Sequence, residues 1–129
     1  MLNKPVDKKT AVNTGSLRLA FLGDAVYSLL VREKLLAEHQ EKVAALNVRL
    51  ANLVSAAAQS SAYEKILPHL TEEETDVLKR GKNAQVGHIP KNQTVKDYHQ
   101  ATAVEALFGY LYLIGDEKRI SEIFDIIHS

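Results

Sequence analysis

The sequence has no cysteine, no net charge and no apolar run long enough to cross a membrane. Without cysteine the chain cannot form a disulfide framework, a thiolate metal site or a cysteine nucleophile. No uncharged apolar run reaches the roughly 18 residues that a membrane helix needs. The polar N-terminal segment MLNKPVDKKTAVNTGS also lacks the apolar stretch of a signal peptide. These absences predict a cytoplasmic protein, in a reducing compartment, with no membrane association.

The helical spacing of the apolar residues predicts an all-α fold. The chain has 129 residues, of which 46% are apolar and 25% charged, as in one ordinary globular domain. From Ser16 onward apolar residues recur at spacings of three and four, and no alternating strand pattern is present. We therefore expect a single domain of five to seven helices over residues 15–129, preceded by a flexible lead-in over residues 1–14.

Local signals give approximate helix boundaries. Helices are predicted over about 16–36 and 95–114, and a short amphipathic helix is expected at the C-terminus. The segment 41–66 could form one bent helix or two short ones. Thr71 with Glu74 three residues later predicts a capping box, and Gly81 is expected to end that helix. Residues 82–93 contain glycine, proline and amides, which indicates a long loop, and loops of about twelve residues are often functional.

Two carboxylates stand alone in apolar helical segments. Asp24 is the only charged residue of LAFLGDAVYSLLV, and Glu105 is the only Asp, Glu, Lys or Arg of YHQATAVEALFGYLYLIG. A carboxylate in an apolar surface is costly unless it is paired, hydrogen-bonded or bound to a metal. The pair therefore suggests two buried helices that bring acids to one site. A divalent cation is the natural ligand, because hard cations prefer oxygen donors.

A structural role for these acids is the alternative. Each could bond to a nearby hydroxyl or to Arg18 or Arg32, and sequence spacing alone does not show that the acids meet. Gly23 lies beside Asp24 within a predicted helix, where glycine costs about 1 kcal/mol relative to alanine. A close backbone contact at Gly23 would explain that cost.

The zero net charge conceals a basic segment. Four acids lie between Glu72 and Asp76, whereas the segment from Lys79 to Lys96 contains five cations and no acid. A strongly basic domain would have argued directly for nucleic acid. Only this segment is basic, and its cations and amides could contact phosphate and 2′-hydroxyl oxygens of an A-form duplex. A solvated helix end followed by a loop is the simpler interpretation of such a charge run.

Three segments together resemble the ribonuclease III family. LRLAFLGDAVYSLLVR is similar to the family's signature helix, and ATAVEALFGYLYLIGD to its second metal-binding helix. EEETDVLKRGKNAQVGHIPKN resembles the matching segment of the short Mini-III branch, which lacks a double-stranded-RNA-binding domain. The resemblance implies a single ribonuclease III-type endonuclease domain that hydrolyses double-stranded RNA, with a ribosomal RNA precursor as the cellular substrate.

The resemblance also implies a metal site and a homodimer. Asp24 and Glu105 match the family's catalytic acids and would hold Mg²⁺, with Mn²⁺ as a substitute ion. In the family, the paired sites of a homodimer cut both strands. Longer relatives carry further acids at the positions of Leu17, Ala20 and Thr102. Thr102 is therefore expected at most to support a water at the ion, and a stable two-metal site without substrate is not expected.

By the same resemblance, the basic loop contacts RNA. The implied RNA-binding residues are Arg80, Lys82, Asn83, Gln85, His88, Lys91 and Asn92. Gln85 stands where a lysine is expected and Lys82 where arginine is usual, which predicts weaker or altered binding because arginine binds phosphate bidentately. Two other functions stay open at this point. One is a non-catalytic structured-RNA-binding module on the same fold, and the other is a helical scaffold whose acids are structural.

Overall fold

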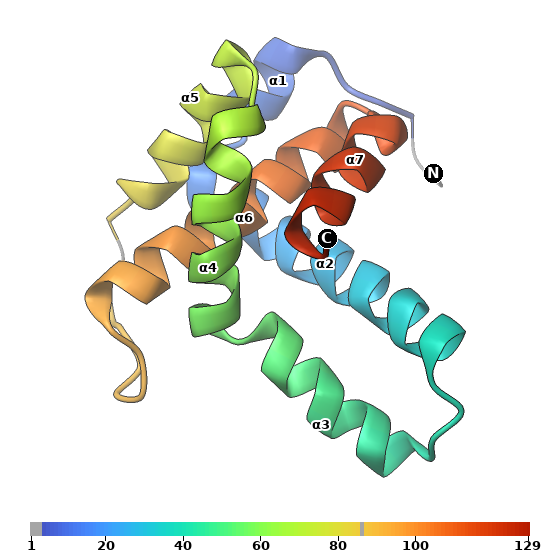
Figure 1. Ribbon diagram of the computed structural model, residues 1–129. Helices are drawn as coiled ribbons and strands as arrows, with labels where there is room; N and C mark the ends of the chain where they lie inside the picture. Colours follow the sequence, from blue (N-terminus) through green and yellow to red (C-terminus); the bar gives the residue numbers. More distant parts are fainter. Residues whose placement is uncertain (1–3, 86) are drawn as a thin grey trace.

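The computed structural model describes residues 4–85 and 87–129, and this part of the chain folds into helices without a β-strand (Figure 1). The elements are α1 (Lys8–Asn13), α2 (Ser16–Glu38), α3 (Val43–Val54), α4 (Ala56–Ile66), a 3₁₀ turn (Leu67–His69), α5 (Glu72–Lys82), α6 (Val95–Leu113) and α7 (Glu117–Ile127). The predicted all-α fold is confirmed.

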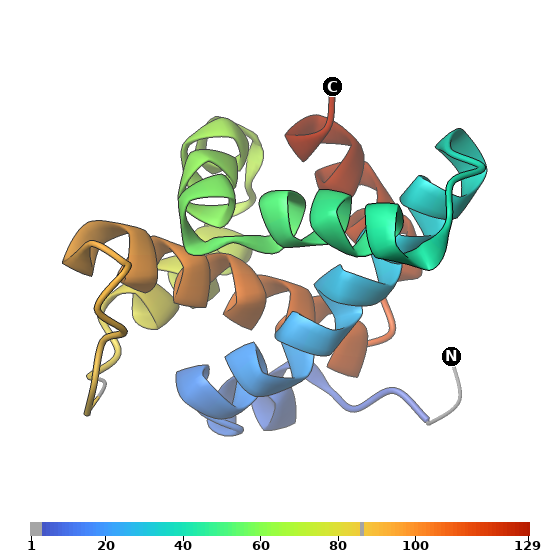
Figure 2. The ribbon, with the colours of Figure 1, turned by 90° about the horizontal axis from the view of Figure 1, so that it is seen from below.

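Helix α6 lies at the centre of the fold, packed against α2, α4 and α5 (Figure 1, Figure 2). From Ala101 to Leu111 its residues are buried on every side except at Glu105, as expected of a helix segment surrounded by protein. Val104, Leu107 and Phe108 are fully buried in it. Tyr27 of α2 meets Phe108 edge-on, with the ring centroids 5.2 Å apart. Despite this apolar character, none of the helices described is long and apolar enough to cross a membrane.

The segment predicted as one bent helix or two short ones forms two helices, divided at Ser55. The backbone of Ser55 is extended (φ −61°, ψ 158°), and its hydroxyl accepts a hydrogen bond from the Ala58 backbone N–H at 3.2 Å. Ser55 therefore ends α3 and caps α4, as short polar side chains do at helix starts. As a result α3 packs along α2, whereas α4 packs on α6.

The predicted capping box of α5 is confirmed, and it also joins α5 to α7. The Glu74 carboxylate accepts a hydrogen bond from the Thr71 backbone N–H at 2.9 Å, and the Thr71 hydroxyl accepts one from the Glu74 N–H. Arg119 of α7 donates to both oxygens of the same carboxylate, at 2.8 and 2.9 Å. Such bidentate, charge-assisted pairs fix orientation as well as distance.

The segment predicted as a flexible lead-in contains α1. The Asp7 side chain caps this helix by accepting a hydrogen bond from the Thr10 N–H at 2.7 Å, and Ala11 is fully buried. The Val6 N–H also donates to the Leu113 carbonyl at the end of α6, at 2.9 Å. A helix of six residues is marginal by itself. The stability of α1 therefore comes from its packing on α6, and the local sequence does not reveal that contact.

The prediction that Gly81 ends α5 is wrong. The helix continues to Lys82, and Asn83 is its C-terminal cap. Gly81 is buried, and a Cβ atom added there would lie 2.8 Å from the Cα atom of Ala103 in α6. Glycine is present because α5 and α6 approach closely at this point, not because the helix stops.

Candidate active site at the crossing of α2 and α6

Two glycines allow the backbones of α2 and α6 to touch. A Cβ atom on Gly23 would overlap with the Glu105 carbonyl oxygen, and one on Gly109 would overlap with the Leu19 carbonyl oxygen. A Cβ on either glycine would also lie close to the backbone nitrogen of the other, at 2.8 and 3.1 Å. The close backbone contact expected at Gly23 is confirmed, and no side chain larger than hydrogen fits there.

This crossing brings Asp24 and Glu105 together. Asp24 directly follows Gly23, and Glu105 lies one helical turn before Gly109. Asp24 is exposed, whereas Glu105 is half-buried. Burial, and then the neighbouring Asp24 carboxylate, raise the pKa of Glu105 to about 8. The two acids are therefore close enough for one to disfavour the charge of the other, which is typical of carboxylates that share a site.

Gln59 of α4 is a third polar side chain at this site, and the sequence analysis did not identify it. It is only 3% exposed, and its amide nitrogen donates a hydrogen bond to the Val54 carbonyl at 3.1 Å. Its hydrogen-bonding contact with Glu105 acts to lower the pKa of that carboxyl. Its amide oxygen is buried and has no donor among the residues described. The only signal in the sequence was a long polar side chain within the small-residue segment AAAQSSA.

The donor set of this site suits a hard divalent cation that keeps most of its waters. No cluster of three or more histidine or acidic side chains that could hold a metal occurs in the part of the chain described. Asp24 and Glu105 offer only oxygen donors, which suit Mg²⁺ and Mn²⁺. The residues present therefore fit Mg²⁺ held by two carboxylates.

The positions at which longer relatives carry acids do not enlarge the acidic site. On the turns of α2 before Asp24, the exposed Leu17 and the buried Ala20 carry no carboxylate. Thr102 lies one turn before Glu105 on α6 and is buried, and its hydroxyl donates to the Tyr98 carbonyl at 2.9 Å. Only the oxygen lone pairs of Thr102 thus remain available to a water.

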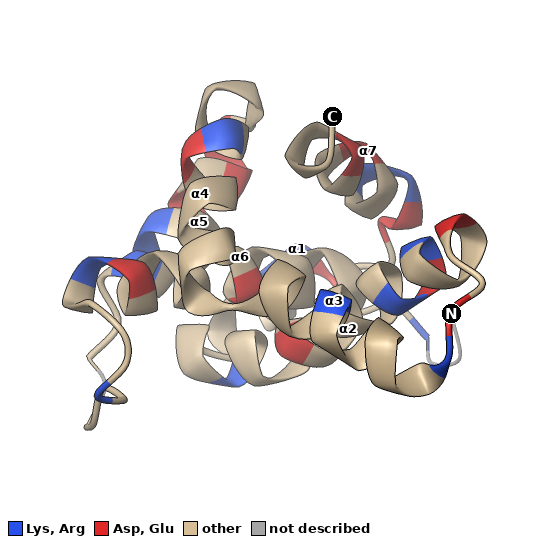
Figure 3. Cartoon of the chain, turned by 60° about the horizontal axis from the view of Figure 1, so that its bottom comes forward, with Lys and Arg blue, Asp and Glu red and all other residues tan. Residues whose placement is uncertain are grey.

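The basic segment lies at one end of α6, away from the two acids. Figure 3 shows Lys and Arg at the end of α5, on the following loop and at the start of α6. Glu105 lies ten positions after Val95, at the start of α6, which corresponds to about 15 Å along the helix. The side chains of Asn83, Gln85, His88, Lys91 and Asn92 are exposed. The structure thus leaves these predicted RNA-binding residues accessible, but brings none of them against Asp24 or Glu105.

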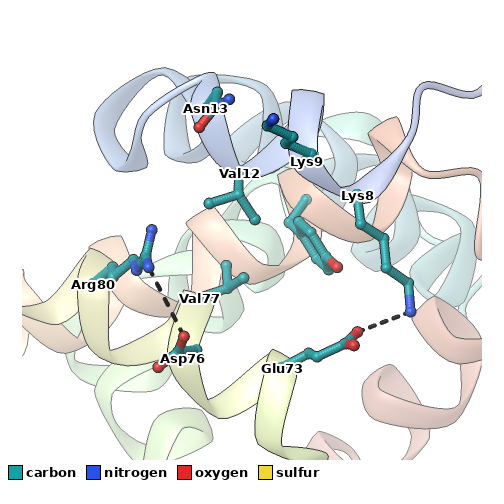
Figure 4. Close-up of a pocket in the computed structure, with 9 residues that line it drawn as sticks. Lys8, Lys9, Val12, Asn13, Glu73, Asp76, Val77 and Arg80 are labelled. Atoms are coloured by element: carbon teal, nitrogen blue, oxygen red, sulfur yellow. Dashed lines mark hydrogen bonds and ion pairs between the residues drawn. The ribbon is translucent and has the colours of Figure 1, made fainter.

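The two predicted RNA-binding cations on α5 face different neighbours. The Lys82 ammonium lies over the Tyr63 ring of α4, 5.4 Å from its centroid. Arg80 instead lies 3.9 Å from Asp76 and lines a cavity of about 270 Å³ between α1 and α5 (Figure 4). Lys8 of α1 and Glu73 of α5 form a 2.8 Å ion pair in the same cavity. Lys82 is thus directed toward α4 and Arg80 toward α1.

Comparison with known proteins gives one consistent family. The profile of the Ribonuclease III domain matches residues 17–116 of this chain. The protein named Mini-ribonuclease 3 of Brevibacillus brevis is 50% identical over 110 residues, which cover 85% of this chain and 82% of the relative. The Mini-ribonuclease 3 of a Thermoanaerobacter species is 40% identical over 119 residues, covering 92% and 84%.

A solved structure has the same fold. The crystal structure of a protein from Fusobacterium nucleatum superposes with a TM-score of 0.83 at 37% identity, covering 91% of this chain and 93% of that one. The matched profile includes both α2 and α6 with their lone acids.

Proposed function

Because the chain belongs to the Mini-ribonuclease 3 branch of the ribonuclease III family, it is an endoribonuclease, and we propose that Asp24 and Glu105 hold the divalent cation at its active site. The observation that carries this proposal is the α2–α6 crossing, where Gly23 and Gly109 bring two otherwise isolated acids together. The proposed reaction is hydrolysis of phosphodiester bonds in double-stranded RNA.

The two carboxylates supply the negative charge that attracts the cation. When bound, Mg²⁺ neutralises charge on phosphoryl oxygens and lowers the pKa of the attacking water. Without a cation the pKa of Glu105 is raised. A nearby cation favours the ionised form of Glu105 and so lowers this pKa. Mn²⁺ should replace Mg²⁺, because the donors are all oxygen. Thr102, one turn before Glu105, is proposed to accept a hydrogen bond from a water at the ion.

The basic segment is proposed to bind the RNA backbone. Exposed lysines and amides along the loop can contact phosphate and 2′-hydroxyl oxygens without reading the base sequence. The loop precedes α6 and lies about 15 Å along that helix from Glu105, so a duplex bound at the loop can extend to the exposed carboxylate of Asp24. Arg80 is exposed as well, but its guanidinium lies 3.9 Å from the Asp76 carboxylate, which offsets part of its charge. A ribosomal RNA precursor as substrate and a cytoplasmic location stay predictions from the family resemblance.

An exposed apolar stripe on α2 supports the proposed homodimer. Leu17, Phe21 and Leu29 lie on the solvent side of α2 and are 46%, 85% and 57% exposed. Leu29 also borders an apolar groove between α2 and α7 that includes Tyr112 and Ile120. An exposed apolar stripe and an apolar groove on one face are typical of protein interfaces, and a second copy of the chain offers both features. Sedimentation equilibrium should show a dimer that Phe21→Glu converts to monomer.

Cleavage of a long RNA duplex tests the proposed site. We expect cleavage with Mg²⁺, none with chelator, and a loss of about 10³-fold for both Asp24→Asn and Glu105→Gln, because several kcal/mol of charge stabilisation is removed. Glu72→Gln, at an exposed acid at the start of α5 and outside the proposed dimer groove, is the matched control and should cleave normally. Duplex binding by the wild-type protein without cleavage would instead support the RNA-binding module, and absence of binding would support the scaffold.

A further inference from the structure

Gln59 is buried where α4 packs on α6, and its surroundings do not provide all its hydrogen bonds. The neighbouring residue Ser60 faces the same helix and donates from its hydroxyl to the Gln100 amide oxygen at 2.6 Å. Gln59 differs from Ser60, whose hydroxyl has a partner, because the Gln59 amide oxygen has no donor among the residues described. Burying an amide with an unsatisfied oxygen costs free energy. The hydrogen bond to the Val54 carbonyl accounts for the amide nitrogen but leaves the buried oxygen unexplained.

The orientation of the Gln59 amide follows from its neighbours. The Val54 carbonyl can only accept a hydrogen bond, so the amide nitrogen must be on the side of Val54, at 3.1 Å. This nitrogen carries two hydrogens, and the second can be directed at the Glu105 carboxylate, which lies near enough to Gln59 for the amide to act on its pKa. One side chain thus connects the α3–α4 junction to the acid on α6.

We propose that Gln59 is a positioning residue for the reaction, whose amide N–H holds the Glu105 carboxylate toward Asp24. The anchor at Val54 fixes the amide, and the amide in turn restricts the rotamers of Glu105. Residues that orient metal ligands from behind typically affect metal affinity or activity by about 10- to 100-fold when they are changed. The inference rests on the proposed function, in which Asp24 and Glu105 hold the cation.

Mn²⁺ binding without RNA measures this role separately from catalysis. The probe is free Mn²⁺, followed by electron paramagnetic resonance in a titration of the purified full-length protein. We expect Gln59→Met, which keeps the length of the side chain but cannot donate, to raise the Kd for Mn²⁺ about tenfold. Ser60→Ala is the matched control. It removes a buried α4–α6 hydrogen bond without touching Glu105, so it should lower Tm and leave the Kd within about twofold of wild type.

Kinetics on an RNA duplex provide the second measurement. Gln59→Met should lower kcat about tenfold and leave KM for RNA nearly unchanged, because the RNA-binding loop is intact. Gln59→Glu keeps the shape and an oxygen but loses the N–H, so its kcat should fall at least as far. This second variant decides the question if Gln59→Met does not fold.

Several results would overturn the proposal. One is a wild-type kcat in Gln59→Glu, and another is equal loss of Mn²⁺ affinity in Gln59→Met and Ser60→Ala. If the wild-type protein itself does not bind Mn²⁺, the proposed metal site fails and the role of Gln59 fails with it. If the wild-type protein binds Mn²⁺ and Gln59→Met binds it equally well, only the role of Gln59 fails.

Discussion

The α2–α6 crossing and the basic segment position their functional groups in opposite ways. At the crossing, backbone contacts through Gly23 and Gly109 leave no space for adjustment, and the buried Gln59 amide acts on the pKa of Glu105. In the loop before α6, the side chains of His88 and Lys91 are exposed, and no hydrogen bond is found for either of them in the described structure. The proposed metal ligands are thus held by packed helix backbones, whereas the proposed RNA contacts are made by solvent-exposed side chains.

The difference follows from what each task requires. Two acids that share one cation must be placed to within a fraction of an ångström, which only buried contacts can ensure. A polyanion is attracted by several cations at once, and long side chains can adapt to it. We therefore expect substitutions at the crossing to change folding and catalysis, and substitutions in the loop to change affinity and its dependence on salt.

The largest expected effect is that of Gly23→Ala. The added methyl group overlaps with the Glu105 carbonyl oxygen, so α2 and α6 must separate, and we expect a loss of about 3 kcal/mol in the free energy of unfolding. Urea denaturation at fixed protein concentration measures this loss. Gly87→Ala is the matched control in the loop, because a Cβ there meets nothing within 4 Å, and it should stay within about 0.5 kcal/mol of wild type. If Gly23→Ala were as stable as Gly87→Ala, α2 and α6 would be able to separate without cost and the crossing would not be rigid.

The next effect is a dependence of stability on pH in chelator. The folded protein keeps a proton on Glu105 up to about pH 8, whereas the ordinary pKa of the group is 4.5. The contribution of this proton to stability is complete below pH 4.5 and is lost as the pH rises through 8. Denaturation from about pH 5 to pH 9 should therefore show a decline in stability, and added Mg²⁺ should reduce it because the cation favours the ionised acid.

Asp24→Asn should make that decline shallower. The substitution removes the neighbouring negative charge, although the burial of Glu105 remains, so the variant should be about 1 kcal/mol more stable than wild type near pH 8. The same titration in chelator measures the difference. A loss of more than about 2 kcal/mol would contradict the shared site and would indicate a structural, hydrogen-bonded Asp24 instead.

The smallest expected effect is on the salt dependence of RNA binding. Lys91→Ala removes one exposed cation from the loop, so the slope of log K against log salt should fall by about one unit. The rate at saturating RNA should not change. Lys118→Ala on α7, beyond the opposite end of α6, is the control and should keep the wild-type slope. A lower rate at saturating RNA with an unchanged slope would place Lys91 in the chemistry rather than in binding.

Features that depend on a few neighbouring residues could be predicted from the sequence. The capping box at Thr71 joins side chain and backbone within one turn, and the apolar spacing of α2 and α6 shows directly which segments are helical. Asp24 and Glu105 were recognisable because each is isolated in an apolar segment. Their meeting could be suggested, since both need a partner, but the sequence could not demonstrate it.

Features that depend on contacts between distant segments could not be predicted. Helix α1 is stabilised by packing on α6, Gly81 is required by Ala103 and not by a turn, and Gln59 gains its role only because α4 lies across α6. In each case the local sequence is compatible with another structure. A glycine near a helix end indicates a cap as readily as a close contact.

The sequence by itself determined the helical class, the isolation of the two acids and the basic character of the segment before α6. These properties follow from residue type and from spacing along the chain. Only the tertiary structure decided that α2 and α6 touch through glycine, that Glu105 lies beside Asp24 and that Gln59 lies near the point where these two helices cross. The reason is physical: local propensities act over about one helical turn, whereas the geometry of the site depends on which helix faces exclude water together.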